Sequence, residues 1–309
     1  MRAICFAAGK ARSCDEGKLL NPAFRPQQTI AKPARVHGVG YWSGQSIQVE
    51  FRPASVDAGI VFVRSDLGGS RIPARVENRV EVPRRTNLVA ADASVEMVEH
   101  VMAALAGLQI DNCEVWVDAA EMPGCDGSSA EFVDALDAAG IQSQNAPRAA
   151  LAVRQVTRVG DADAWVEARP ADEFSLECNI HYANNRAIGQ QTFGPAAMTP
   201  KRFRDELASA RTFLLEEEAN WLRERGIGGH VSLQDLLIFD DDGPKENPLR
   251  FENECVRHKT LDMIGDLALA GCDLQGHFTA HGAGHRLNAE LVKQLLADAQ
   301  VMEGLRKTA

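Results

Sequence analysis

The sequence predicts an α+β protein that is built from two halves of similar outline. The chain has 309 residues, which is long for a single α+β core, so two domains are expected. Segments with strand signals precede segments with helical periodicity, and this order occurs twice. Between the two series, NAPR at 145–148 combines turn-forming Asn and Pro, and strand signals start again after it. We therefore predict an extension over residues 1–26, a first α+β domain over 27–146 and a second over 147–309.

In the first half, alternating apolar and polar residues over 28–65 predict strands that are interrupted by Gly-rich turns. From Ser94 onwards, SVEMVEHVMAALAGL has apolar residues at helical spacing, with Ser94 as the expected N-cap. The sequence DNCEVWVDA at 111–119 predicts a strand. Residues 122–141 are expected to form a Gly-rich turn and then a second helix.

The second half repeats this outline without a residue-level repeat that would establish duplication. Strand signals occur in ALAVRQVTRVG, AWVEARPA and FSLECNIHY, within residues 150–182. Helical periodicity follows in PKRFRDELASA, NECVRHKTLDMIGDLALAG and LNAELVKQLLADAQ, within residues 200–300.

The composition excludes several classes of protein. With 45% hydrophobic residues, 25% charged residues and a net charge of −10, the chain is typical of a globular protein. It has no Lys/Arg-dense run, so we expect no binding to nucleic acid or to an anionic membrane surface. Seven scattered cysteines without a CxxC pair argue against a disulfide framework and favour the reducing cytoplasm. No segment approaches the ~20 apolar residues of a membrane span, and residues 1–24 lack the pattern of a signal peptide and are expected to be poorly ordered.

Two short segments contain residues that can bind a metal. Glu99 and His100 lie within the first predicted helix, where a lone histidine is most often structural. His258 and Asp262 are four residues apart on another predicted helix, so they share one face. That spacing also suits a plain surface hydrogen bond. Two histidines and one carboxylate form a known catalytic zinc set with an open position for water, and Glu99 is then the candidate to take the proton from that water.

Further candidates lie nearby in the second half. GHFTAHGAGHRLN at 276–288 has three histidines in nine residues, which suits either a metal-binding tract or a polar Gly-rich loop. His285 is alternatively a general acid, oriented by Asp266, which lies one turn beyond Asp262. Thr212 in ARTFLL could donate a hydrogen bond to a developing oxyanion, although such a segment is ordinarily structural.

Taken together, these segments resemble the UDP-3-O-acyl-N-acetylglucosamine deacetylases of lipid A biosynthesis. The resemblance covers most of residues 28–290 in the family's order, and its longest parts are VEH-x-MAALAGL-x-IDN and HK-x-LD-x-IGD. The matching stretches are GVGYWSG, RPASVDAGIVF, VEHVMAALAGLQIDN, DGSSAEFV, QNAPR, ARTF, RFENECVRHKTLDMIGDL and GHRLN. The family implies two ββαα-type domains that pack as a sandwich with a zinc site between them.

Carried over position by position, the resemblance assigns a role to each candidate. It implies His100, His258 and Asp262 as metal ligands, Glu99 as general base, and His285 as general acid supported by Asp266. It places Thr212 on the oxyanion side, Phe213 near the sugar and Lys259 near the substrate's phosphates. The implied reaction removes a 2-N-acetyl group from a UDP-linked glucosamine. Zinc is the expected ion, and Fe(II) or Co(II) would accept the same ligands.

The departures from the family gather around the substrate. The family usually has a histidine where this chain has Trp42, and smaller side chains where it has QDLLIF at 234–239. The segment 226–232 does not align cleanly with the family's passage for a fatty acyl chain. These differences leave open a paralogous deacetylase of another N-acetyl amino sugar, with an altered acyl passage.

Two other interpretations stay open. One is a metal- or ligand-binding protein without catalysis, although structural zinc needs neither an adjacent base nor an acid. The other is an α+β scaffold in which His100 and His258 lie far apart. Nothing in the sequence indicates an obligate partner, so we expect a monomer that binds a small nucleotide-sugar and does not insert into membranes.

Overall fold

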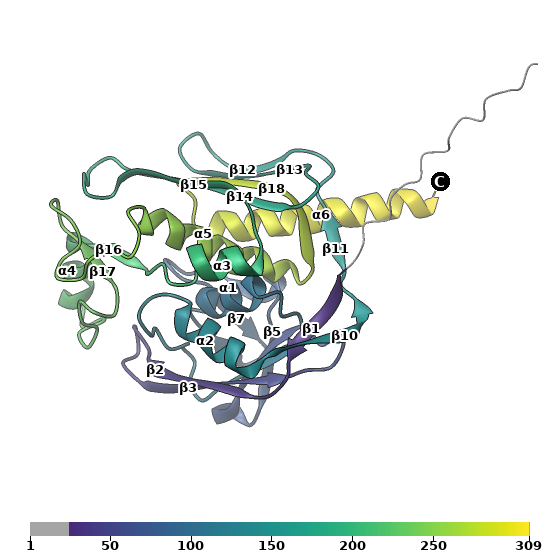
Figure 1. The fold of residues 1–309 in the computed structure, drawn as a ribbon, viewed down its shortest axis with the longest axis horizontal. Helices are drawn as coiled ribbons and strands as arrows, with labels where there is room; N and C mark the ends of the chain where they lie inside the picture. Colours follow the sequence, from purple (N-terminus) through teal and green to yellow (C-terminus); the bar gives the residue numbers. More distant parts are fainter. Residues whose placement is uncertain (1–24, 309) are drawn as a thin grey trace, which may run out of the picture.

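A computed structural model describes residues 25–308, and it has two main sheets with helices between them (Figure 1). The predicted α+β class is confirmed. The predicted extension over 1–26 lies outside the described residues, apart from Arg25 and Pro26.

The two main sheets are each formed by strands from one half of the sequence. The first has the order β2 (Ala34–Val39), β3 (Ser46–Pro53), β9 (Cys113–Val117), β4 (Ile60–Arg64) and β5 (Ser70–Pro73). The second has the order β12 (Thr157–Gly160), β13 (Trp165–Arg169), β18 (Asp273–His281), β14 (Phe174–Tyr182) and β15 (Gly189–Ala197), and β11 (Ala150–Ala152) pairs with β18.

The two sheets have the same topology. In the first, the central strand β9 runs antiparallel to β3 and parallel to β4. In the second, the central strand β18 runs antiparallel to β13 and parallel to β14. This match supports two halves of similar build, while the predicted domain boundaries stay a prediction.

Shorter elements complete the strands. Strands β1 (Pro26–Ile30) and β10 (Ile141–Pro147) pair as an antiparallel ribbon. Of the two, β10 is the strand that directly precedes the second half of the sequence. A three-stranded sheet contains β6 (Arg79–Val80), β7 (Asn87–Ala90) and β8 (Ala93–Val95). A parallel pair, β16 (Phe213–Leu215) and β17 (Leu237–Phe239), flanks helix α4 (Glu216–Glu224). The 3₁₀ turns are η1 (Ser65–Leu67), η2 (Val76–Asn78) and η3 (Ala268–Ala270).

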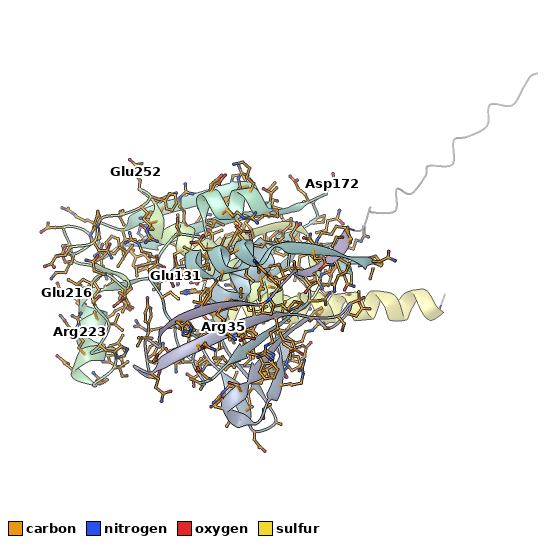
Figure 2. All side chains as sticks on the ribbon, turned by 60° about the horizontal axis from the view of Figure 1, so that its bottom comes forward. Arg35, Glu131, Asp172, Glu216, Arg223 and Glu252 are labelled. Atoms are coloured by element: carbon orange, nitrogen blue, oxygen red, sulfur yellow. The ribbon has the colours of Figure 1, made fainter. Side chains whose placement is uncertain are left out.

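The remaining helices follow the predicted order. They are α1 (Glu99–Gly107), α2 (Ala130–Ala139), α3 (Pro200–Glu206), α5 (Glu254–Leu267) and α6 (His285–Thr308). Among the described residues, no helix is long and apolar enough to cross a membrane. Among the side chains labelled in Figure 2, the charged Arg35, Glu131, Asp172 and Glu252 are exposed.

The predicted start of the first helix was wrong. Ser94 is not its N-cap but pairs with Val89 as part of β8. Met97 then has a left-handed φ of 59°, a conformation that interrupts a right-handed helix. Helix α1 therefore begins only at Glu99, and the left-handed residue redirects the chain so that Glu99 and His100 occupy the helix's first turn.

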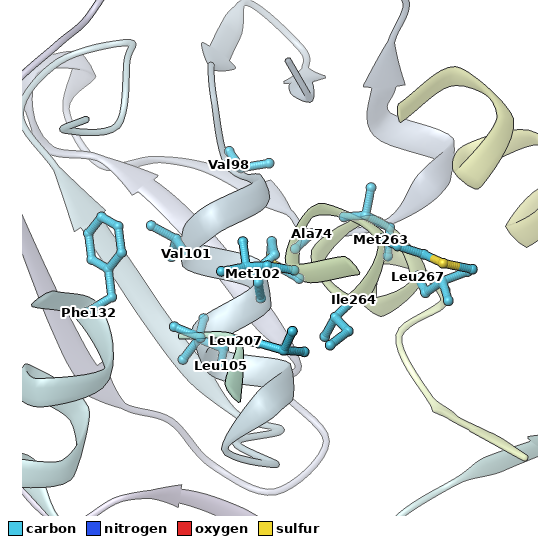
Figure 3. Close-up of a cluster of buried hydrophobic side chains, with 14 of the residues drawn as sticks. Ala74, Val98, Val101, Met102, Leu105, Phe132, Leu207, Met263, Ile264 and Leu267 are labelled. Carbon is cyan, nitrogen blue, oxygen red and sulfur yellow. The ribbon is translucent and has the colours of Figure 1, made fainter. Parts of the chain in front are cut away.

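The core lies where helices from the two halves pack together. Figure 3 shows Val101, Met102 and Leu105 of α1 beside Ile264 and Leu267 of α5, and all five are at most 3% exposed. Full burial of such a side chain contributes about 1.5–3 kcal/mol. The packing of these helices thus stabilises the contact between the two halves.

The close approach of α1 and α5 depends on Gly265. A Cβ atom at this position would lie 2.2 Å from the carbonyl oxygen of Glu99 and 3.1 Å from the amide nitrogen of Ala103. Both atoms belong to the backbone of α1, so they cannot move away as a flexible side chain would. Only glycine permits this helix spacing.

We expect Gly265→Ala to push α1 and α5 apart. Although alanine favours a helix more than glycine does, the clash should lower the free energy of unfolding by about 1–3 kcal/mol, measured by urea denaturation. Gly229→Ala is the control, because a Cβ atom there meets nothing within 4 Å. Equal stability of both variants would contradict this account of the helix packing.

Candidate metal centre and active site

The candidate site lies at the N-terminal part of α1, where α5 passes beside it. Helix α1 places Glu99 and His100 at its first two positions, and α5 presents His258 and Asp262 one turn apart. All four residues are at most 4% exposed. The interpretation that requires His100 and His258 to be far apart is wrong, because their ring centroids are 5.1 Å apart.

His100, His258 and Asp262 fit a metal ion. Their ligand atoms lie within 4.8 Å of one another. Asp262 Oδ1 is 3.4 Å from His258 Nε2 and 3.7 Å from His100 Nε2. Asp262 Oδ1 and His100 Nδ1 are buried without a hydrogen-bond partner among the described residues. A buried carboxylate oxygen facing two imidazoles is a costly arrangement by itself, and a cation would satisfy it.

The protonation states of the three residues suit that role. Burial, together with the nearby His258, lowers the pKa of His100 to about 3. Burial likewise lowers the pKa of His258, whose Nδ1 lies 3.1 Å from the carbonyl oxygen of Ala210. Burial raises the pKa of Asp262, but the neighbouring His258 and the ammonium of Lys259 outweigh it and the net shift is downward. Neutral imidazoles and an ionised carboxylate are the forms that ligate metals.

Glu99 lies beside this cluster with one carboxylate oxygen fixed. Its Oε2 accepts a hydrogen bond of 2.9 Å from the backbone N–H of Thr86. Burial raises the pKa of Glu99 to about 7, although the charge of His285 opposes the shift. A carboxylate with a pKa near neutrality can both accept and release a proton.

His285 and Asp266 form a hydrogen-bonded pair next to Asp262. His285 is the first residue of α6, and its Nδ1 lies 2.8 Å from Asp266 Oδ2. Its Nε2 lies 3.9 Å from Asp262 Oδ2. Burial opposes ionisation of the ring, but the charge and hydrogen bond of Asp266 raise the pKa of His285 to about 9. A protonated imidazole is the form that can donate a proton.

The other predicted residues surround the cluster. Lys259 donates a hydrogen bond of 2.9 Å to Asp262 Oδ2, and its ammonium lies 5.8 Å from the centroid of Phe213. The ring centroids of Phe213 and His258 are 6.5 Å apart. Thr212 precedes β16, where its N–H donates to the carbonyl of Gly127. The structure thus brings all nine predicted site residues to one region.

A cleft of about 120 Å³ connects these groups. Its polar lining side chains are Glu99, His100, Thr212, Lys259, Asp262 and His285, together with His258. Its apolar lining side chains include Leu214, Leu222, Val231, Leu236 and Ile238, and Leu214, Val231, Leu236 and Ile238 pack in one hydrophobic cluster. These come from β16, α4, β17 and the loop between α4 and β17. The cleft therefore offers a polar reaction site beside an apolar chamber.

The interpretation of residues 276–288 as a metal tract or a Gly-rich loop was wrong for most of its length. Residues up to His281 form β18, in which alternate side chains are buried against the helices. His277 and His281 point to the other face, where His277 Nδ1 lies 2.9 Å from the hydroxyl of Ser175 and His281 stacks on Trp165. Only His285 reaches the site.

Several residues that complete the site are not predicted from the sequence. Thr86 contacts Glu99 and Asp266, but a threonine before a short strand has no recognisable pattern. Asn288 donates to Asp266 Oδ2 over 2.8 Å, and its position three residues after His285 on α6 is a helical spacing that could have identified it. Tyr41 lines the cleft and donates a hydrogen bond to the carbonyl of Asp235.

Comparison with known proteins agrees with the sequence resemblance. The family model for UDP-3-O-acyl N-acetylglycosamine deacetylase matches residues 27–297. Proteins named UDP-3-O-acyl-N-acetylglucosamine deacetylase from Brucella ovis, Brucella canis and Brucella abortus are each 39% identical to this chain over 280 residues. The match covers 90% of this chain and 97% of each relative. The chain therefore belongs to the UDP-3-O-acyl N-acetylglycosamine deacetylase family.

Proposed function

We propose that this chain hydrolyses the N-acetyl group of UDP-3-O-acyl-N-acetylglucosamine, a step of lipid A biosynthesis. One observation carries the proposal: a buried cluster of two histidines and one carboxylate shares a cleft with a separate carboxylate and a separate His–Asp pair. A structural metal site needs only the ligands. The additional Glu99 and His285 favour a hydrolase over a protein that only binds a metal or a ligand.

The family is metal-dependent, and His100, His258 and Asp262 would hold the ion. We infer zinc, because two imidazoles and a carboxylate are a common catalytic zinc set, and Fe(II) would fit the same ligands. When bound, the ion lowers the pKa of a water molecule and polarises the acetyl carbonyl.

The protein's own groups manage the protons. Glu99 accepts the proton of the attacking water, for which its free oxygen and its pKa near neutrality are suited. The ring of His285 is oriented by the hydrogen bond between its Nδ1 and Asp266. Its Nε2 is then the nitrogen that protonates the departing amine. Thr212 donates to the oxygen on which negative charge develops. The products are acetate and a free amino group on the sugar.

The remaining contacts bind the substrate. Lys259 supplies a positive charge for the phosphates, and its pairing with Asp262 raises its pKa despite burial, so the ammonium form persists. Phe213 packs its ring beside the sugar. The apolar chamber, with Leu214, Leu236 and Ile238, receives the acyl chain.

We further infer that the enzyme works as a cytoplasmic monomer without a nucleic-acid partner. The described cysteines Cys113, Cys125, Cys178, Cys255 and Cys272 are all unpaired, which supports a reducing compartment. The net charge of −10 supports the absence of nucleic-acid binding.

Turnover of UDP-3-O-acyl-N-acetylglucosamine by the zinc-loaded protein tests the proposed reaction. Glu99→Gln should keep about one zinc per chain while kcat falls by about 10²–10⁴, because the glutamine cannot take the proton. Glu167→Gln, a buried position on β13, should leave kcat unchanged. A zinc-loaded wild-type protein that hydrolyses no N-acetyl sugar nucleotide would instead favour the non-catalytic interpretation.

A second candidate function is favoured by the shape of the chamber. Trp42, Leu236 and Ile238 all line the cleft, at positions where the family usually has a histidine or smaller side chains. We infer that the enzyme accepts a short 3-O-acyl group or a related N-acetyl amino sugar without one. An apolar pocket discriminates between substrates by only about 1–3 kcal/mol per methylene. A preference for short acyl groups therefore requires that these side chains block the space that a long acyl chain would occupy.

A series of substrates with 3-O-acyl chains of increasing length tests this candidate. We expect kcat/KM for long chains to be no higher than for short chains in the wild-type protein. Leu236→Ala should enlarge the chamber and raise kcat/KM selectively for the long chains. A strict requirement for a long chain in the wild-type protein would rule the altered chamber out.

A further inference from the structure

We propose that Thr86 is a positioning residue that ties Glu99 to the Asp266–His285 pair. This inference rests on the proposed deacetylase function and assigns one residue the task of fixing both proton-transfer groups. Thr86 is 1% exposed, immediately precedes β7, and does not line the cleft. It therefore acts through its neighbours and not by touching the substrate.

Thr86 makes three hydrogen bonds to the groups that form the site. Its hydroxyl donates to Asp266 Oδ1 over 2.6 Å. Its backbone N–H donates to Glu99 Oε2 over 2.9 Å. Its carbonyl accepts the N–H of Val98 over 3.0 Å, directly before α1. A single residue of the first half is thus bonded to the start of α1 and to a carboxylate on α5.

The hydroxyl bond completes the environment of Asp266. Asp266 is fully buried, and its Oδ2 accepts from His285 Nδ1 and Asn288 Nδ2, both at 2.8 Å. Among the described residues, Thr86 is the only hydrogen-bond donor to Oδ1. The plane of the carboxylate is therefore set from both sides, and this plane determines where His285 Nε2 points.

The backbone bond has the corresponding effect on Glu99. With Oε2 held by the Thr86 N–H, the other oxygen of the buried carboxylate is left to accept a proton. Because both bonds come from one residue, the distance between the proton acceptor and the proton donor is fixed by the position of Thr86. Such preorganisation matters because small displacements of catalytic groups slow the chemistry.

Substitutions at Thr86 isolate the hydroxyl, since every variant keeps the backbone N–H. Thr86→Val keeps the shape and removes the hydroxyl, so kcat should fall about 10- to 100-fold, with KM within about twofold and about one zinc per chain retained. Thr86→Ser restores the hydroxyl and should keep kcat within about threefold. Thr86→Ala provides the same comparison if the valine variant does not fold.

Thr29→Val is a matched control. Thr29 is also a buried threonine of the first half, and its hydroxyl donates to the carbonyl of Asn112 over 2.6 Å, away from the site. This variant should lose stability and leave kcat unchanged. A serine variant as slow as the valine variant, or a valine variant with full kcat, would overturn the assignment.

A melting comparison tests the same bond without turnover. Thr86→Val should lower Tm by about 2–6 °C in the wild-type background and not lower it further in the Asp266→Ala background, where the partner is missing. Equal lowering in both backgrounds would refute the bond. Absence of turnover by the wild-type protein would contradict the proposed function. The melting comparison would still show whether the hydroxyl of Thr86 is bonded to Asp266.

Discussion

The close contact between α1 and α5 is the constraint on which the rest of this structure depends. Gly265 lets the backbones of the two helices meet at Glu99 and Ala103, and this contact places His100 beside His258 and Asp262. The two helices occupy equivalent places, since each precedes the central strand of its own sheet, β9 or β18. Neither half has the complete cluster, so the candidate metal centre exists only where the halves pack together.

Burial then sets the chemical state of the site. Removal from water favours the neutral forms of His100 and His258 and brings the pKa of Glu99 to near neutrality. For Asp262 and His285, charged neighbours outweigh burial and favour the ionised form. Asp262 is paired with Lys259, and His285 is paired with Asp266. The same low-polarity surroundings therefore hold two neutral imidazoles, one ionised carboxylate and one protonated histidine within one cleft, which suits the proposed amide hydrolysis.

Much of the site could be predicted because its signals are local. The i, i+4 spacing of His258 and Asp262 and the adjacency of Glu99 and His100 are visible in the sequence, and the family resemblance joined them. The distance between the two segments was not visible, because it depends on a glycine contact between helices from different halves. Ser94 was assigned to a helix because its surroundings have helical periodicity, whereas Met97 adopts a left-handed conformation and its neighbours form β8. Thr86 had no local signal, since its partners are 13 and 180 residues away.

The central claim is that residues from both halves hold one metal ion. Anomalous diffraction at the zinc edge, from crystals of the zinc-loaded protein, tests this claim most directly. The account predicts a single peak at about 2.0–2.2 Å from an imidazole nitrogen of His100, an imidazole nitrogen of His258 and a carboxylate oxygen of Asp262. A principal peak on the outer face of β18, at His277 or His281, or one that contacts ligands from only one half, would contradict it.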